Sequence, residues 1–166
     1  MEYIENEQLK LANNFVQNTG RNIFLTGKAG TGKTTFLKNI KKNTNKRHIV
    51  VAPTGVAAIN ASGVTIHSFF QLPFGPIIPA EKSTDGNWLF KSPATRDVYV
   101  QRFSKAKINI MRSLDLLIID EISMVRADVL DGIDVILRRI RRSSQPFGGV
   151  QLLMIGDMQQ LAPVVK

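Results

Sequence analysis

The stretch GKAGTGKT at residues 27–34 decides the fold, because it fits the pattern GxxxxGK followed by serine or threonine. An apolar run at residues 23–25 precedes it and is expected to form a strand. A helix is expected to follow it, with the apolar side chains of Phe36, Leu37 and Ile40 facing inward. A strand before the loop and a helix after it are the context that this pattern requires, so we predict a phosphate-binding loop.

The glycines of this stretch let the backbone curl, so that successive N–H groups face a phosphate at the positive end of a helix. Lys33 can then reach the terminal phosphates, and the hydroxyl of Thr34 can bind Mg²⁺. A glycine-rich turn without a ligand is the alternative interpretation. The loop in this context favours a nucleoside triphosphate with magnesium.

Nearly all-apolar runs alternate with segments of helical period along the rest of the chain. Besides the helix after the loop, we expect helices at residues 6–18, 56–60 and 127–142, and strands at residues 23–25, 48–52, 114–119 and 151–155. This alternation predicts an α/β fold with a central parallel sheet flanked by helices on both faces. Residues 73–93 hold four of the seven prolines, and we predict a long loop there.

Acidic residues follow the third expected strand. Asp120 stands where a carboxylate points into the crevice that binds ligands in open α/β sheets, so it can hold Mg²⁺. Glu121 comes next and can act as the general base that activates water. A solvated cap at the end of a strand is the alternative for this pair. After the fourth strand, the stretch GDMQQLAP at residues 156–163 stands where polar groups can sense a γ-phosphate.

Length and composition set further bounds. A chain of 166 residues with ordinary globular composition indicates one domain. Lys and Arg outnumber Asp and Glu by 22 to 13, a balance that fits nucleic acid as a partner and fits a merely basic surface equally well. The lack of cysteine excludes disulfides, thiolate zinc sites and thiol nucleophiles. No apolar run could cross a bilayer and no targeting segment is evident, so we expect no membrane partner, a cytoplasmic location and a bacterial source.

Four segments together resemble the petite-integration-frequency (PIF) family of superfamily 1, whose members are 5′-to-3′ DNA helicases. FLTGKAGTGKTTFL resembles the nucleotide loop of that family, and LLIIDEISMV its motif for metal and water. VVAPTGVAAINASGVTIHSFF resembles its DNA-contacting motifs, and GGVQLLMIGDMQQLAPVV its γ-phosphate sensor. The resemblance runs from about residue 5 to the end. It implies a RecA-like P-loop NTPase fold, ATP and Mg²⁺ as cofactors, single-stranded DNA as a partner, and work in DNA repair, recombination and telomere maintenance.

The resemblance also implies roles for individual residues. The catalytic residues would be Lys33, Glu121 as the base, and Gln160 as the sensor of the γ-phosphate. Gln8 would recognise adenine, with a solvated residue in the first helical turn as the alternative. The nucleotide would also contact Gly27, Gly30, Thr31, Gly32, Lys33, Thr34 and Thr35, and the metal would bind Thr34 and Asp120. Single-stranded DNA would contact Thr54, Gly55, Val56, His67, Ser68 and Phe69.

Two groups of residues have a structural interpretation as the alternative to a role in binding DNA. Thr54 could simply begin a helix, and Phe69 and Phe70 could pack in the core, where we expect at least one of them. The arginine pairs at 138–139 and 141–142 could contact DNA, but arginines in the last turn of a helix complement its dipole, so we expect them to stay solvated.

The chain ends at Lys166, just past the third nucleotide motif, so residues 1–166 are expected to be the first RecA-like motor domain of a longer, monomeric protein. A second RecA-like domain in the same polypeptide would supply arginines worth on the order of 10³–10⁵ in rate. The isolated chain should therefore hydrolyse ATP slowly if at all, and should not unwind duplex DNA.

Other classes use the same loop. A GTPase would need an Asn-Lys-x-Asp guanine reader, which the NKRH stretch at residues 45–48 does not supply. A nucleotide kinase would need an arginine-rich lid, and residues 73–93 hold no arginine. A nucleotide-gated binding module without useful turnover remains open as a third interpretation.

Overall fold

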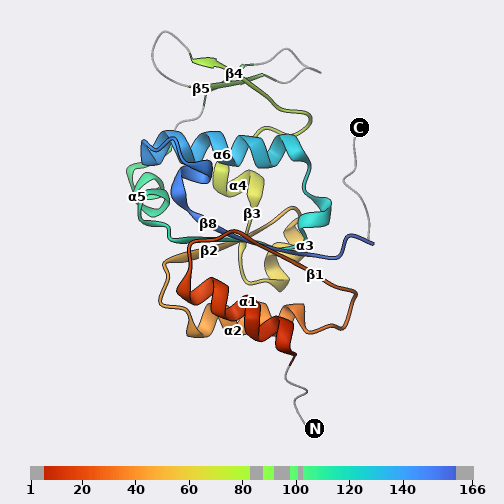
Figure 1. Cartoon of the computed structure of the whole chain (residues 1–166). Helices are drawn as coiled ribbons and strands as arrows, with labels where there is room; N and C mark the ends of the chain where they lie inside the picture. Colours follow the sequence, from red (N-terminus) through yellow and green to blue (C-terminus); the bar gives the residue numbers. More distant parts are fainter. Residues whose placement is uncertain (1–5, 83–87, 92–97, 101–102, 160–166) are drawn as a thin grey trace.

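The main sheet has five strands and is parallel throughout (Figure 1). A computed structural model describes residues 6–82, 88–91, 98–100 and 103–159. The strands in spatial order are β1 (Ile23–Thr26), β8 (Gln151–Gly156), β7 (Leu116–Ile119), β2 (His48–Ala52) and β3 (Val64–Thr65). The predicted α/β fold is confirmed. The two-residue strand β3 was not predicted, because two residues are too short to show a period.

Helices cover both faces of this sheet (Figure 1). One face carries α1 (Glu7–Asn18) and α2 (Lys33–Asn43), and the other carries α4 (Ile66–Phe70), α5 (Lys105–Ser113) and α6 (Ala127–Arg141). The short helix α3 (Gly55–Asn60) connects β2 to β3. Two short 3₁₀ turns, Ile122–Met124 and Pro146–Gly149, complete the described elements. No described helix is long and apolar enough to span a membrane.

Strand β7 shows how the sequence places the core. All four of its residues are buried. Leu116 and Ile118 pack with α1 and α2, whereas Leu117 and Ile119 pack with α4, α5 and α6. Successive side chains of a strand point to opposite faces, so an all-apolar strand is stable only between two layers. Each fully buried leucine or isoleucine side chain contributes about 1.5–3 kcal/mol to the free energy of unfolding. Because helices cover both of its faces, β7 lies at the centre of the domain.

The prediction of a long loop at residues 73–93 was wrong for part of that range. Strands β4 (Ile78–Lys82), β5 (Trp88–Lys91) and β6 (Val98–Val100) form a separate antiparallel sheet in the order β4-β5-β6. Pro79 lies in β4, which is an edge strand, where the missing N–H of proline is tolerated. The number of prolines therefore indicated a loop where the chain forms an edge strand.

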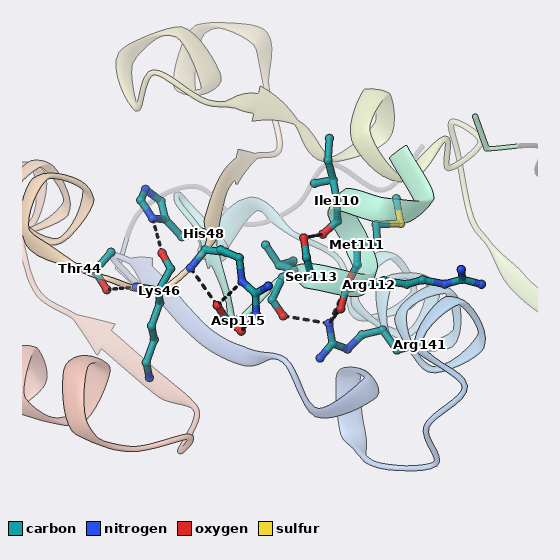
Figure 2. A network of polar contacts seen from close by, with 11 residues as sticks. Thr44, Lys46, His48, Ile110, Met111, Arg112, Ser113, Asp115 and Arg141 are labelled. Atoms are coloured by element: carbon teal, nitrogen blue, oxygen red, sulfur yellow. Dashed lines mark hydrogen bonds and ion pairs between the residues drawn. The ribbon is translucent and has the colours of Figure 1, made fainter. Parts of the chain in front are cut away.

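Helix α6 ends one residue before the predicted position, because Arg142 takes a left-handed conformation with φ 53°. The expectation that its last arginines stay solvated was wrong for Arg141. That guanidinium is half-buried and donates to the carbonyls of Met111, Arg112 and Leu114 at 3.0, 2.7 and 2.9 Å, as Figure 2 shows in part. It acts as a cap for the last turn of α5, whose carbonyls have no partner within their own helix.

Candidate functional site

The glycine loop lies at the carboxyl edge of the sheet, between β1 and α2 (Figure 1). Gly30 and Gly32 have φ values of 80° and 91°, a left-handed region that side chains with a Cβ rarely adopt. Gly32 is the N-cap of α2, and no side chain caps this end of the helix. The first N–H groups of an α-helix have no partner within the helix, so this end of α2 is suited to bind an anion.

Lys33 folds back over the loop. Its Nζ donates to the carbonyl oxygens of Gly27 and Lys28, the latter at 2.8 Å. The hydroxyl of Thr31 donates to the carbonyl of Lys28 at 2.8 Å as well. The ammonium group therefore already lies within the curve of the loop, and a bound phosphate would offer it a charged acceptor in place of neutral carbonyls.

Asp120 and Glu121 stand directly after β7, beside the loop. The backbone N–H of Asp120 donates to the carbonyl of Val51 at 2.9 Å, and the N–H of Glu121 donates to Oδ1 of Asp120 at 3.1 Å. Glu121 has φ 54° and ψ 46°, a left-handed conformation that costs energy for a residue other than glycine. Such strain persists only where the surroundings enforce it, and it is frequent at functional sites.

The electrostatics of this acidic pair also differ from those of surface carboxylates. Burial raises the pKa of Asp120 above its ordinary value, against the opposing charge of Lys33. Burial likewise raises the pKa of Glu121, and the charges of Asp120 and Asp157 raise it further. Both carboxylates thus lie within electrostatic reach of Lys33, and a raised pKa is typical of groups that move protons.

One cleft brings the predicted metal ligands together. It measures about 340 Å³ and is lined by residues of α2, of α3 and of the turn after β7, among them Thr34, Thr54, Asp120 and Glu121. Thr34 and Asp120 are far apart in sequence, yet they face the same cleft. A hydroxyl and a carboxylate are both oxygen donors of the kind that Mg²⁺ prefers.

A second hollow lies on the other side of the loop, between α1 and α2. It measures about 710 Å³, and its polar lining includes Lys10, Asn13 and Asn39. Sequence reasoning missed these three residues, although Lys10 and Asn13 recur at helical spacing. Gln8 is exposed in the first turn of α1 and is not among the lining residues. Its role in recognising adenine remains a prediction.

The residues assigned to DNA fall into exposed and buried groups. Thr54 caps α3, accepting from the N–H of Ala57 at 3.2 Å, and Gly55 and Val56 are exposed in the first turn of that helix. On α4, Ser68 is exposed and His67 is half-buried.

Phe69 is only 6% exposed, and its ring meets that of Phe70 edge-on at 4.9 Å. Both phenylalanines belong to the core, so the packing alternative is confirmed and the ring of Phe69 is not available to stack a base.

The third nucleotide motif is described only at its beginning. Gly156, the last residue of β8, and Asp157, which follows it, are buried, and Oδ1 of Asp157 accepts from the N–H of Gln159 at 3.0 Å. A Cβ on Gly156 would approach Ile122 to 2.8 Å, so the close contact with the turn after Asp120 requires glycine. Gln160 lies outside the described residues.

The parallel sheet, the glycine loop at its carboxyl edge and the acidic pair beyond β7 define a RecA-like domain of the P-loop type. The chain belongs to the PIF1-like helicase family, whose family model matches residues 4–166. It is 39% identical over 163 residues to the ATP-dependent DNA helicase PIF1 of Saccharomyces cerevisiae, a match that covers 95% of this chain and 17% of that protein. The human ATP-dependent DNA helicase PIF1 is 38% identical over 148 residues, covering 89% of this chain and 21% of that protein.

Solved structures agree with this assignment. The crystal structure of Bacteroides sp Pif1 in complex with ADP-AlF4 matches with a TM-score of 0.83 and 47% identity, over 99% of this chain and 35% of that one. Bacteroides Pif1 bound to ssDNA matches with a TM-score of 0.82 and 47% identity, over 99% and 34%. The chain thus spans about a fifth of the length of these curated relatives and about a third of these solved chains.

Proposed function

We propose that this chain is the first motor domain of a 5′-to-3′ DNA helicase. It binds Mg-ATP at the carboxyl edge of its sheet, holds single-stranded DNA along α3 and α4, and couples ATP hydrolysis to translocation and unwinding within a longer protein. One observation carries the proposal: Thr34, Asp120 and Glu121, a hydroxyl and two carboxylates from separate motifs, line the same cleft beside the glycine loop.

The nucleotide part of the proposal rests on the loop. The triphosphate would accept hydrogen bonds from the N–H groups at the start of α2, and the ammonium of Lys33 would move from the carbonyls of Gly27 and Lys28 to the terminal phosphates. The contacts would extend over residues 27–35. The hollow between α1 and α2 is suited to the base and ribose. Gln8, exposed in the first turn of α1, is the proposed adenine reader.

The donor set fits magnesium. Thr34 and Asp120 would hold the ion, and their two oxygen donors leave the remaining positions to phosphate oxygens and water, which is how Mg²⁺ is usually bound. When bound, the ion would neutralise charge on the β- and γ-phosphates.

Glu121 would accept a proton from a water molecule whose oxygen forms a bond to the γ-phosphorus, while the bond between that phosphorus and the bridging oxygen breaks and ADP leaves. Its raised pKa makes it a better base than an ordinary glutamate. Gln160, beyond β8, would sense the γ-phosphate.

The DNA part of the proposal rests on exposed residues and on charge. Thr54, Gly55 and Val56 begin a helix, where N–H groups can meet a phosphate, and His67 and Ser68 follow on α4. A formal charge of +9 favours a polyanion. Relatives in this family have been solved bound to ssDNA, one of them together with ADP-AlF3.

The rest of the motor would lie outside this chain. A second RecA-like domain in the same polypeptide would supply the arginines that complete the site, so the isolated chain would turn over ATP slowly. We expect it to be a monomer in the cytoplasm, with a bacterial source, and to act with that second domain rather than with a membrane.

Turnover of ATP by the purified chain, with and without a single-stranded dT oligonucleotide, tests the proposal. A motor domain gives a slow rate that DNA increases, and the Lys33→Ala variant gives no turnover under either condition. Phosphorylation of a small acceptor would indicate a kinase instead. Tight ATP binding with no turnover under any condition would indicate that this chain alone is a nucleotide-gated binding module. The kinase result would overturn the motor assignment, and the absence of turnover would overturn the hydrolysis proposed for this chain.

A further inference from the structure

Phe74 is a large apolar side chain that is 83% exposed. Scattered exposed apolar residues are common on protein surfaces and need no explanation by themselves. Phe74 differs because the chain around it is fixed in place and because one face of its ring is already stacked on another ring.

The segment that carries Phe74 is held at both ends. Leu72 and Ile77, on either side of it, are buried in the core beside α4 and α6. The N–H of Ile77 donates to Oδ2 of Asp128 at 2.7 Å, and Nη2 of Arg126 donates to the carbonyl of Gly75. Arg126 and Asp128 also pair with each other, so one ion pair at the start of α6 fixes the residues that follow Phe74.

The ring of Phe74 stacks on the imidazole of His67. Their centroids are 5.0 Å apart and the rings are inclined by 13°. Burial and the charge of Arg126 lower the pKa of His67, against the charge of Asp128. Two nearly parallel rings stand together, the inner one half-buried in α4 and the outer one with its far face open to solvent.

Lys107, on α5, brings a positive charge to α4. Nζ of Lys107 donates to the carbonyl of Ser68, the residue after His67, at 3.1 Å, and lies 5.5 Å from the centre of the Phe69 ring. Flat aromatic faces beside cations are the combination that proteins use for single-stranded nucleic acid, where the bases stack on rings and the phosphates meet positive charge.

We propose that the open face of Phe74, backed by His67, is a stacking platform for one nucleobase of single-stranded DNA. This inference rests on the proposed function, and it adds a residue outside the motifs that the resemblance assigned to DNA. Because the segment is already fixed by Arg126 and Asp128, little conformational entropy is lost when a base stacks on the ring. Every base has a flat face, so the platform does not select a sequence.

Two oligonucleotides test the platform directly. One is fluorescein-labelled dT15, and the other has the same sugar-phosphate backbone with all bases removed. Fluorescence anisotropy at low salt gives the affinity of the wild-type chain and of each variant for both. Removing the ring with Phe74→Ala should weaken binding of dT15 by roughly 5- to 100-fold, the range expected for the loss of one stacked base. Binding of the abasic strand should not change.

Control variants separate stacking from other effects. Phe74→Trp keeps a flat ring and should retain the affinity for dT15. Phe24→Ala removes a different exposed phenylalanine, on strand β1, and should bind both strands as the wild type does. Thermal unfolding of each variant checks that the fold is intact, which the exposure of both side chains favours.

Each remaining outcome counts against one of the two proposals. Equal binding of dT15 by Phe74→Ala and wild type would overturn the platform and leave the proposed function standing. An equal loss for both strands would also overturn it, because the ring would then act without a base. Failure of the wild-type chain to bind dT15 at all would overturn the proposed function, and the platform with it.

Discussion

At the amino edge of the parallel sheet, Asp115 accepts three hydrogen bonds from Arg47, whereas at the carboxyl edge Asp120 and Glu121 face an open cleft. The carboxylate of Asp115 accepts from the backbone N–H, Nε and Nη2 of Arg47 at 3.0, 2.8 and 2.9 Å (Figure 2). Arg141, on the same side of the domain, donates to four carbonyl oxygens. The polar groups named at this edge are satisfied within the chain.

The two edges also shift pKa values in opposite directions. The hydrogen bond from Arg47 lowers the pKa of Asp115, whereas burial raises the pKa of Asp120 and of Glu121. Glu121 is also held in a left-handed backbone conformation. Charges that are paired within the chain stabilise the fold, while charges held at an energetic cost around a cleft are available to a ligand. We infer from this difference that the charges at the amino edge stabilise the fold and that those at the carboxyl edge serve function.

The largest expected effect concerns the proposed base at the carboxyl edge. Glu121→Gln keeps the shape of the side chain but removes its ability to accept a proton. We expect ATP turnover to fall by roughly 10²- to 10⁴-fold while nucleotide affinity stays near that of the wild type. Phosphate release over long incubations measures the rate. Glu7→Gln, an exposed glutamate of α1, serves as the matched control, and turnover by Glu121→Gln at the control's rate would remove Glu121 from the mechanism.

The next effect concerns Lys33. Lys33→Ala should reduce affinity for ATP by roughly 100-fold or more, because charge-assisted hydrogen bonds to the phosphates are lost. The free energy of unfolding should change little, since the hydrogen bonds of this side chain are to carbonyls of its own loop. Titration with a fluorescent ATP analogue measures the affinity. Lys28→Ala, an exposed lysine of the same loop, should bind nearly as well as wild type, and equal affinities for the two variants would contradict the assignment.

At the amino edge, the largest effect is expected from Arg141. Arg141→Ala removes four hydrogen bonds and leaves the carbonyls of Met111, Arg112, Leu114 and Gly148 without this donor. We expect the free energy of unfolding to fall by about 2–4 kcal/mol, with ATP affinity unchanged. Urea denaturation measures the loss. The neighbouring Arg142→Ala, at an exposed position, should change stability by less than about 0.5 kcal/mol. A similar loss for both variants would mean that Arg141 does not act through these contacts.

The smallest expected effect is on the free energy of unfolding, which should change in opposite directions when a carboxylate is removed from one edge or from the other. The folded state binds the proton of Asp120 more tightly than the unfolded state does, so ionisation of this group lowers stability as pH rises from 3.8 through the raised pKa. Asp120→Asn should therefore stabilise the nucleotide-free protein at pH 7, by up to about 1 kcal/mol after screening by solvent.

Asp115 should behave in the opposite way. Its lowered pKa means that its contribution is present above pH 3.8 and is lost as pH falls through the folded pKa. Asp115→Asn should therefore destabilise the protein at pH 7, by less than about 1 kcal/mol, and this difference from wild type should vanish in acid. Urea denaturation between pH 3 and pH 7 measures both variants, and a shift of the same sign in both would remove the contrast between the edges.

The carboxyl edge was more predictable from sequence than the amino edge, because its signals are local. The glycine pattern of residues 27–34 and the apolar run before Asp120 fixed the loop, the strand and the edge that they share. The placement of Thr34 and Asp120 in one cleft follows from that topology. The family assignment rested on four segments of the sequence that resemble PIF helicases, and it is confirmed.

The features that sequence reasoning missed depend on distant partners. Arg141 appeared as one of four arginines at a helix end, and only the fold brings α5 and residues 146–149 against it. Strand β3 pairs through two residues, and the antiparallel strands lie in a proline-rich stretch. Phe74 has no signature in sequence, because its exposure and its stacking on His67 arise from the packing around it.

A crystal structure of the chain with a non-hydrolysable ATP analogue and Mg²⁺ tests the central claim most directly. We predict a triphosphate lying against residues 27–35, with the ion bound by the hydroxyl of Thr34 and by Asp120, either directly or through water. A nucleotide bound away from the glycine loop, or an ion remote from both of these side chains, would contradict the account.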